Sequence, residues 1–162
     1  MLLSFPHRLT RPLGMALAIL GLLAFAPALK AGVVAKGLQG KYKVSSAVTY
    51  VNGQQQPKPD LPTSTYSIGT KGLGAVTGAT LSKINSATGG GNGTRITVVS
   101  STSTTLSATL AGTIGGHNNA TIISGNLKSS LQTSGWTINF NIKANNHGQQ
   151  ATVSIVIILK KF

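Results

Sequence analysis

Acidic side chains are almost absent from this 162-residue chain: fourteen Lys and Arg residues stand against the single acid Asp60, and there is no cysteine. Glycoside hydrolysis by paired carboxylates and calcium binding by a carboxylate cage both need several acids. The lack of cysteine excludes a disulfide framework and thiolate metal sites. The composition therefore predicts a protein that is not an enzyme and that holds neither a metal nor a cofactor.

The remaining candidate catalytic residues do not form a recognisable site. Asp60 stands among prolines in the segment Pro57–Pro62 and is expected to be a solvated turn residue. His117 and His147 each lie beside asparagine in turn-like segments, without acids to orient their rings. The glycine-rich stretch 89–93 lacks the Lys-Ser/Thr pair of a phosphate loop. No catalytic, cofactor-binding or metal-binding residue is predicted.

The first 28 residues have the layout of a secretory signal peptide. Basic residues in Met1–Arg11 precede an apolar run over Leu13–Phe25, and Ala26-Pro27-Ala28 supplies the small residues of a cleavage site. The alternative is an uncleaved anchor, but the run is shorter than the ~20 residues of a spanning helix. We expect cleavage after Ala28, a single domain over residues 29–162, and an exported protein, periplasmic or extracellular.

Beyond the signal, apolar residues alternate with Ser, Thr and Asn at a period of two, which predicts strands rather than amphipathic helices. Leu73–Ile84 is ambiguous and is expected to be a bulged strand or a helix-like excursion. Turns are predicted at Asn52-Gly53, Gly115–Asn118, Gly125-Asn126 and Asn145–Gly148, and a flexible loop at 87–93. The strands are expected at Tyr42–Val51 with a short return arm, Thr63–Ile68, Arg95–Ser100, Thr105–Ile114, Ala120–Ser124, Trp136–Lys143 and Ala151–Leu159.

About eight short strands joined by Gly- and Asn-rich turns indicate an all-β domain, an antiparallel sandwich or a small barrel. Ala151–Leu159 is apolar on both faces, so we expect it to be central and covered on both sides, or to face lipid. The predicted core residues are Tyr42, Val44, Val48, Leu106, Leu110, Ile122, Trp136, Ile138, Phe140, Val153, Ile155 and Ile157.

Cleavage would remove Arg8 and Arg11 and leave twelve basic residues against one acid, a formal charge of +11. Such a surface suits adhesion to an anionic polymer or a lipid headgroup plane, or life in acid. A sequence-specific nucleic-acid module is not expected, because the mature chain has one arginine and no basic-aromatic cluster. The possible anion contacts are Lys36, Lys41, Lys43, Arg95, Lys128, Lys143, Lys160 and Lys161, concentrated only at 36–43 and 160–161.

The sequence therefore predicts a non-enzymatic binding or structural protein of the periplasm or cell surface, with a cationic face for anionic envelope material. Two alternatives remain open. Gly40-Lys41-Tyr42 resembles the Gly-x-Trp start of lipocalin-like barrels, which implies a small barrel that carries an apolar ligand. Phe162, after an apolar strand, resembles the ending of outer-membrane β-barrels.

Overall fold

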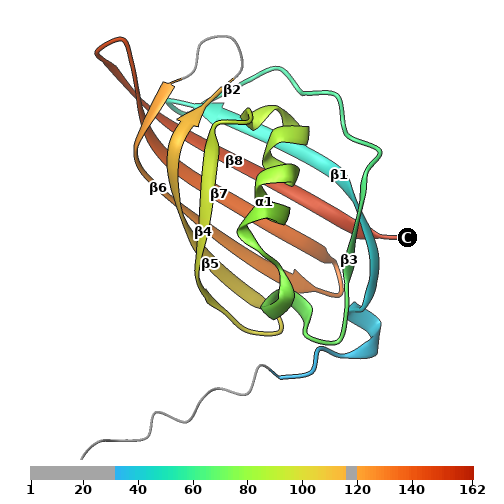
Figure 1. Cartoon of the computed structure of the whole chain (residues 1–162). Helices are drawn as coiled ribbons and strands as arrows, with labels where there is room; N and C mark the ends of the chain where they lie inside the picture. Colours follow the sequence, from blue (N-terminus) through green and yellow to red (C-terminus); the bar gives the residue numbers. More distant parts are fainter. Residues whose placement is uncertain (1–31, 116–119) are drawn as a thin grey trace, which may run out of the picture. The chain divides into compact units, whose positions relative to one another are not determined.

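Strands dominate the fold because β-branched and other apolar residues alternate with Ser, Thr and Asn along most of the chain (Figure 1). The computed structural model describes residues 32–115 and 120–162, which belong to one compact unit. The predicted signal peptide and most of the predicted turn at 115–118 lie outside these residues.

Eight strands, one α-helix and three short helical turns follow one another along the described chain. The strands are β1 (Gly40–Val51), β2 (Gln54–Gln55), β3 (Thr65–Ile68), β4 (Thr94–Ser101), β5 (Thr105–Ile114), β6 (Ala120–Gln132), β7 (Gly135–Asn146) and β8 (Gln149–Lys161). The helical segments are η1 (Lys36–Leu38), η2 (Gly72–Ala75), α1 (Gly78–Asn85) and η3 (Ser86–Gly90).

All eight strands pair antiparallel in one open sheet, in the order β2-β1-β8-β7-β6-β5-β4, with β3 on the opposite end of β1 from β2. The predicted number of strands and their antiparallel pairing are confirmed. Where the sequence left a sandwich and a small barrel open, the structure has a single open sheet that curves around α1 (Figure 1).

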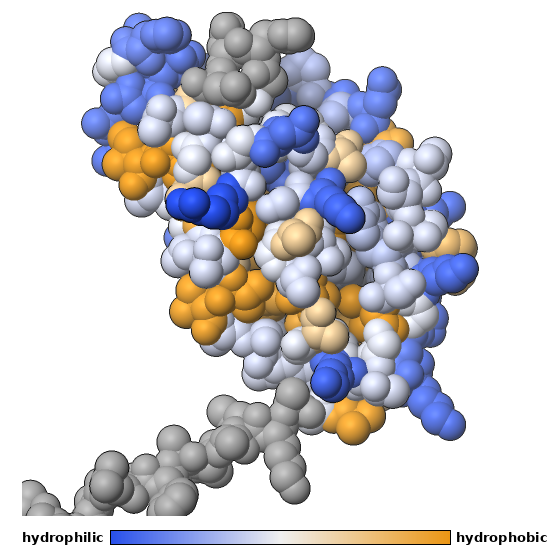
Figure 2. All heavy atoms as spheres, viewed as in Figure 1, coloured by the Kyte–Doolittle hydropathy of each residue, from blue (hydrophilic) through white to orange (hydrophobic). Residues whose placement is uncertain are grey.

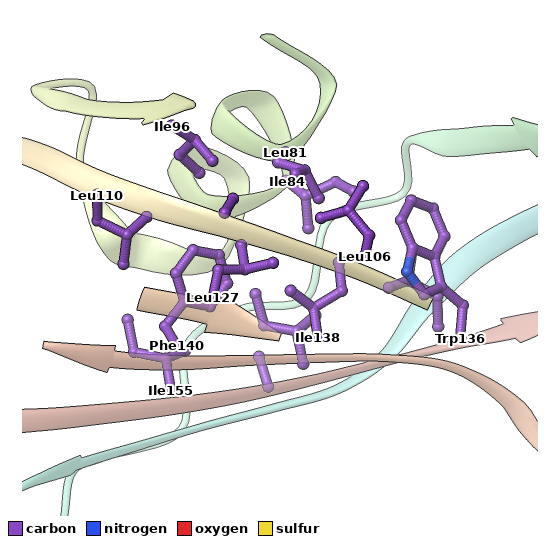
Figure 3. Packing of buried hydrophobic residues seen from close by; sticks show 14 of the residues in the cluster. Leu81, Ile84, Ile96, Leu106, Leu110, Leu127, Trp136, Ile138, Phe140 and Ile155 are labelled. Atoms are coloured by element: carbon purple, nitrogen blue, oxygen red, sulfur yellow. The ribbon is translucent and has the colours of Figure 1, made fainter. Parts of the chain in front are cut away.

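The helix α1 forms where the sequence was ambiguous. Thr77 caps it by accepting a hydrogen bond from the Thr80 backbone N–H at 3.3 Å. Leu81 and Ile84, three residues apart, are fully buried against the sheet (Figure 3). Of the two alternatives left open for Leu73–Ile84, the structure therefore has the helix-like excursion, as η2 and α1. The sequence did not indicate an amphipathic helix there, because two apolar residues in two turns give a weak pattern.

Next to α1, the outermost strand β4 has its free edge covered. Gly78 lies so close to β4 that a Cβ there would stand 2.0 Å from the Ile96 carbonyl oxygen. The Ser82 hydroxyl donates to the Thr94 carbonyl, and beyond the end of β4 the Leu73 N–H of η2 donates to the Ser103 carbonyl. An uncovered edge strand invites pairing with other chains, and the contacts at Thr94 and Ile96 cover the first half of β4.

The core lies between the inner face of the sheet and α1 (Figure 3). Trp136 is its largest residue; its ring meets Tyr42 edge to face at 6.5 Å, and its indole N–H donates to Ser129 Oγ at 2.6 Å. The predicted core residues that are buried are Tyr42, Val44, Leu106, Leu110, Ile122, Trp136, Ile138, Phe140, Ile155 and Ile157, and Val153 packs against them half-buried.

Val48 is the core prediction that fails. A bulge in β1 between Val44 and Ser46 shifts the alternation by one residue, so Ala47 turns inward and is buried. Val48 and Tyr50 therefore lie half-exposed on the outer face of the sheet. Strict alternation from Tyr42 predicted the opposite, because a bulge leaves no mark in a period-two pattern.

Two other predictions of local structure are corrected. Gly125-Asn126 is not a turn: both residues lie inside the long strand β6, opposite Ile142 and Asn141 of β7. The predicted loop at 87–93 begins as the helical turn η3, where the Thr88 hydroxyl donates to the Ile84 carbonyl. By contrast, the turn predicted at Asn52-Gly53 is confirmed, and the one predicted at Asn145–Gly148 is confirmed at its last two residues, His147-Gly148, since Asn145 and Asn146 belong to β7. Asn52, Gly53, His147 and Gly148 all have positive φ.

The strand β8 is central, as expected, between β1 and β7. Its odd-numbered residues Ile155, Ile157 and Leu159 are buried, whereas Val156 and Ile158 are half-buried on the outer face. The expectation that β8 is covered on both faces is therefore only half right.

Candidate anion-binding surface

The two faces of the sheet differ sharply in chemistry. The inner face carries the core, and where the alternation of a strand is regular the residue between two core residues points to the outer face. A cross-strand row on that outer face runs from Thr109 through Asn126 and Asn141 to Ser154. All eight predicted anion contacts are exposed, and alternation places six of them on this face: Lys41, Lys43, Arg95, Lys128, Lys143 and Lys160.

The pairing of β1 with β8 brings together the two basic concentrations of the sequence, which lie more than 110 residues apart. Lys43 stands directly opposite Lys160, and Tyr42 opposite Lys161. The turn η1, which contains Lys36, precedes β1 and lies at the same end of the sheet. We call the group Lys36, Lys41, Lys43, Lys160 and Lys161 the basic corner.

Local contacts hold the side chains of the basic corner. The Lys161 ammonium donates to the Gly37 carbonyl at 3.0 Å, which ties the end of β8 to η1. The aliphatic part of the Lys161 side chain packs over Gly40, where an added Cβ would lie 2.7 Å from Lys161 Cε. The Lys43 ammonium lies over the Phe162 ring, 5.5 Å from its centre, in a cation–π contact.

The basic corner has no acidic side chain to balance it. The chain's single acid, Asp60, is exposed in the segment between β2 and β3, as predicted, and makes no ion pair. Like charges directly opposite each other in a sheet, as at Lys43 and Lys160, destabilise the fold by roughly 0.2–1 kcal/mol. An anion bound between the two ammonium groups would remove that repulsion.

The other three cations of the outer face are dispersed. Lys128 lies opposite Asn139, four residues along β7 from Lys143, which corresponds to about 13 Å. Lys143 borders a shallow hollow of about 350 Å³ that Asn126, Asn141 and Thr152 also line. Arg95 lies on β4, at the far edge of the sheet. The separation between these charges exceeds the ~8 Å screening length in physiological salt, so each charge acts on an anion independently of the others.

The residues weighed for catalysis or metal binding stay apart. His147 is exposed at the β7–β8 turn, and His117 lies outside the described residues. In the part of the chain that the structure describes, no three His, Cys, Asp or Glu residues cluster. Within the same ranges, no Lys or His side chain is hydrogen-bonded to a Ser or Thr hydroxyl, the arrangement that a hydroxyl nucleophile would need.

Sequence reasoning found every residue of the basic corner but not the corner itself. Each lysine was visible as a member of a short basic segment, whereas the meeting of the segments depends on β1 pairing with β8. The matching apolar character of the first and last long strands is the only signal that could have indicated this pairing.

Comparisons with known proteins add no relative. No protein-family model matches the chain, and no match was found among curated proteins or solved structures. Over residues 32–115 and 120–162, no helix is long and apolar enough to cross a membrane.

Proposed function

We propose that this protein is an exported, non-enzymatic adhesion domain of the periplasm or cell surface, and that its basic corner binds anionic envelope polymers. The single observation that supports this most is the register of β1 and β8, which gathers five exposed lysines at one end of the sheet. No acidic side chain accompanies them, and the only one in the chain lies in a loop elsewhere.

For binding to anionic polymers, exposed lysine side chains are better suited than a pocket of fixed shape. The lysine ammonium is a compact, strongly hydrated charge on a flexible stem, so it contacts sulfates, phosphates and carboxylates of irregular spacing. Neighbouring strands place cross-strand residues about 5 Å apart. The Lys43–Lys160 pair is therefore closer than the ~8 Å screening length and attracts an anion jointly.

A second candidate, carriage of an apolar ligand, needs an internal cavity on the concave side of the sheet. Leu81 and Ile84 of α1 occupy that side, are fully buried, and belong to the same core cluster as Leu106 and Ile138 of the sheet (Figure 3). The packing therefore favours the cationic surface as the functional site.

Retention on immobilised heparin and on lipopolysaccharide across a salt gradient tests the proposal. We expect the protein to elute well after a neutral protein of similar size, because each lysine in contact with a linear polyanion adds roughly one to the salt slope. Elution together with the neutral control would contradict it.

A further inference from the structure

A second polar site lies on the opposite side of the molecule, along α1. Two hollows of about 520 Å³ and 530 Å³ flank this helix, and Lys83 and Ala87 line both. One hollow extends to β3 and the residues before it, and the other extends to Asn92. Figure 1 shows α1 between β3 and β4, and Figure 2 shows this face as mostly of intermediate hydropathy. We call the two hollows together the Lys83 groove.

The β3 side of the groove offers hydrogen-bonding groups without partners. The hydroxyls of Ser64, Thr65 and Ser67 form no hydrogen bond with any residue in the described ranges 32–115 and 120–162. Tyr66 also lines this hollow, and burial raises the pKa of its phenol, so the hydroxyl remains a donor at neutral pH. On the other side, the hydroxyls of Ser82 and Ser86 already donate to the Thr94 and Gly91 carbonyls.

Lys83 supplies the only charge in the groove. Its ammonium is exposed and makes neither an ion pair nor a hydrogen bond with the residues that the structure describes. No acidic side chain lines either hollow. One unpaired cation beside several hydroxyls complements a ligand with one negative charge and several hydroxyl groups of its own, because hydroxyls both donate and accept.

The dimensions and lining narrow the ligand class further. The volumes fall within the 300–1,000 Å³ of small-ligand sites. Six of the ten lining residues are Ser or Thr, so the groove is rich in hydroxyl groups. A bare phosphate would leave most of the hydroxyls without a partner. A saccharide unit that carries one carboxylate uses both the cation and the hydroxyls.

We propose that the Lys83 groove binds an acidic saccharide unit, with its carboxylate on the Lys83 ammonium and its hydroxyls against Ser64, Thr65 and Ser67. This site is separate from the basic corner. Saccharide binding at the groove therefore does not depend on the proposed binding of polyanions at the corner.

The test titrates the isotope-labelled protein with galacturonate, which carries one carboxylate, and follows backbone amide shifts by NMR. We expect saturable shifts at residues 64–67 and 80–87, and at least tenfold weaker binding for Lys83→Gln. Lys71→Gln is the matched control, since it removes the same charge from an exposed lysine outside the groove, and it should bind as the unchanged protein does.

Two reference ligands separate the alternatives. Neutral galactose and sodium phosphate should each bind at least tenfold more weakly than galacturonate. Equal binding of galactose, equal binding of phosphate, or equal loss of affinity in both lysine variants would overturn the proposal. The double variant Lys43→Gln/Lys160→Gln should leave the titration unchanged, which distinguishes this site from the basic corner.

Discussion

At the scale of single residues, the hydrogen bonds of buried polar groups contribute to the stability of the core. Trp136 is almost completely buried, and its indole N–H has one partner, the hydroxyl of the equally buried Ser129. A buried donor without a partner costs more than the hydrogen bond itself contributes, because its desolvation is no longer offset. Ser129 is a polar residue on the otherwise apolar inner face of β6. Its presence there is explained by Trp136, whose N–H needs an acceptor.

Ser129→Ala should lower the free energy of unfolding by about 1–3 kcal/mol, because it leaves the Trp136 N–H unpaired. Urea unfolding followed by the fluorescence of Trp136, the chain's only tryptophan, measures the change. Ser130→Ala on the outer face is the matched control and should shift stability by less than about 0.5 kcal/mol. Equal effects of the two substitutions would contradict the assigned role of Ser129.

Tyr42 should make stability depend on pH in the alkaline range. Burial raises the pKa of its phenol above the ordinary value of a tyrosine, and its hydroxyl donates to the Leu38 carbonyl at 2.8 Å. The folded protein therefore holds this proton more tightly than the unfolded chain does. The resulting stability is fully present below the unfolded pKa and is lost as the pH rises through the folded pKa.

The measurement compares the unchanged protein with Tyr42→Phe, since both share every lysine that titrates in the same range. The stability advantage of the unchanged protein should shrink between pH 9 and pH 12. An advantage that stays constant or grows would show that the Tyr42 proton is not held more tightly in the folded state.

At the scale of elements, the sequence predicted strands well and their departures from regularity poorly. The strands at Thr105–Ile114 and around Trp136 follow from alternation alone, since each buries one face. The bulge that turns Val48 outward and the long course of β6 through Gly125 depend on pairing with neighbouring strands. Local sequence carries little information on such pairing, and the same limit hid the basic corner.

The helix α1 gives the clearest conflict between local preference and tertiary contact. Alanine is favoured over glycine within helices by about 1 kcal/mol. However, a Cβ at Gly78 would stand 2.0 Å from the Ile96 carbonyl oxygen. Gly78 thus permits the close approach of α1 to β4 that covers the free edge of the sheet.

Gly78→Ala should consequently destabilise the protein by about 1–3 kcal/mol, against the sign that helix preference predicts. Gly37→Ala is the control, because a Cβ there meets nothing within 4 Å, and it should stay within about 0.5 kcal/mol of the unchanged protein. Denaturant midpoints give both values. A stabilised Gly78→Ala variant would mean that α1 does not approach β4 as described.

At the scale of the whole molecule, the lack of acids affects both stability and binding. Acid unfolding usually follows the protonation of carboxylates that are paired or hydrogen-bonded in the native state. The only side-chain acid here, Asp60, is exposed and has no such partner. Protonating Asp60 and the three histidines adds only four charges to a formal +13.

The protein should therefore keep its fold in acid. We expect the melting temperature to change by less than about 5 °C between pH 7 and pH 3, which corresponds to about 1 kcal/mol for a domain of this size. Calorimetry or circular dichroism at the two pH values checks this. A cooperative acid transition above pH 3 would reveal a native-state interaction that depends on Asp60 or on a terminal carboxylate.

The central claim is that the basic corner, rather than the total charge, governs binding to polyanions. Two double variants test it, because each removes two positive charges: Lys43→Gln/Lys160→Gln at the corner, and Lys128→Gln/Lys143→Gln on the dispersed outer face. The measurement is the salt concentration at which each elutes from heparin. The corner variant should elute at clearly lower salt than the dispersed variant, whereas equal elution of the two would show that only net charge matters.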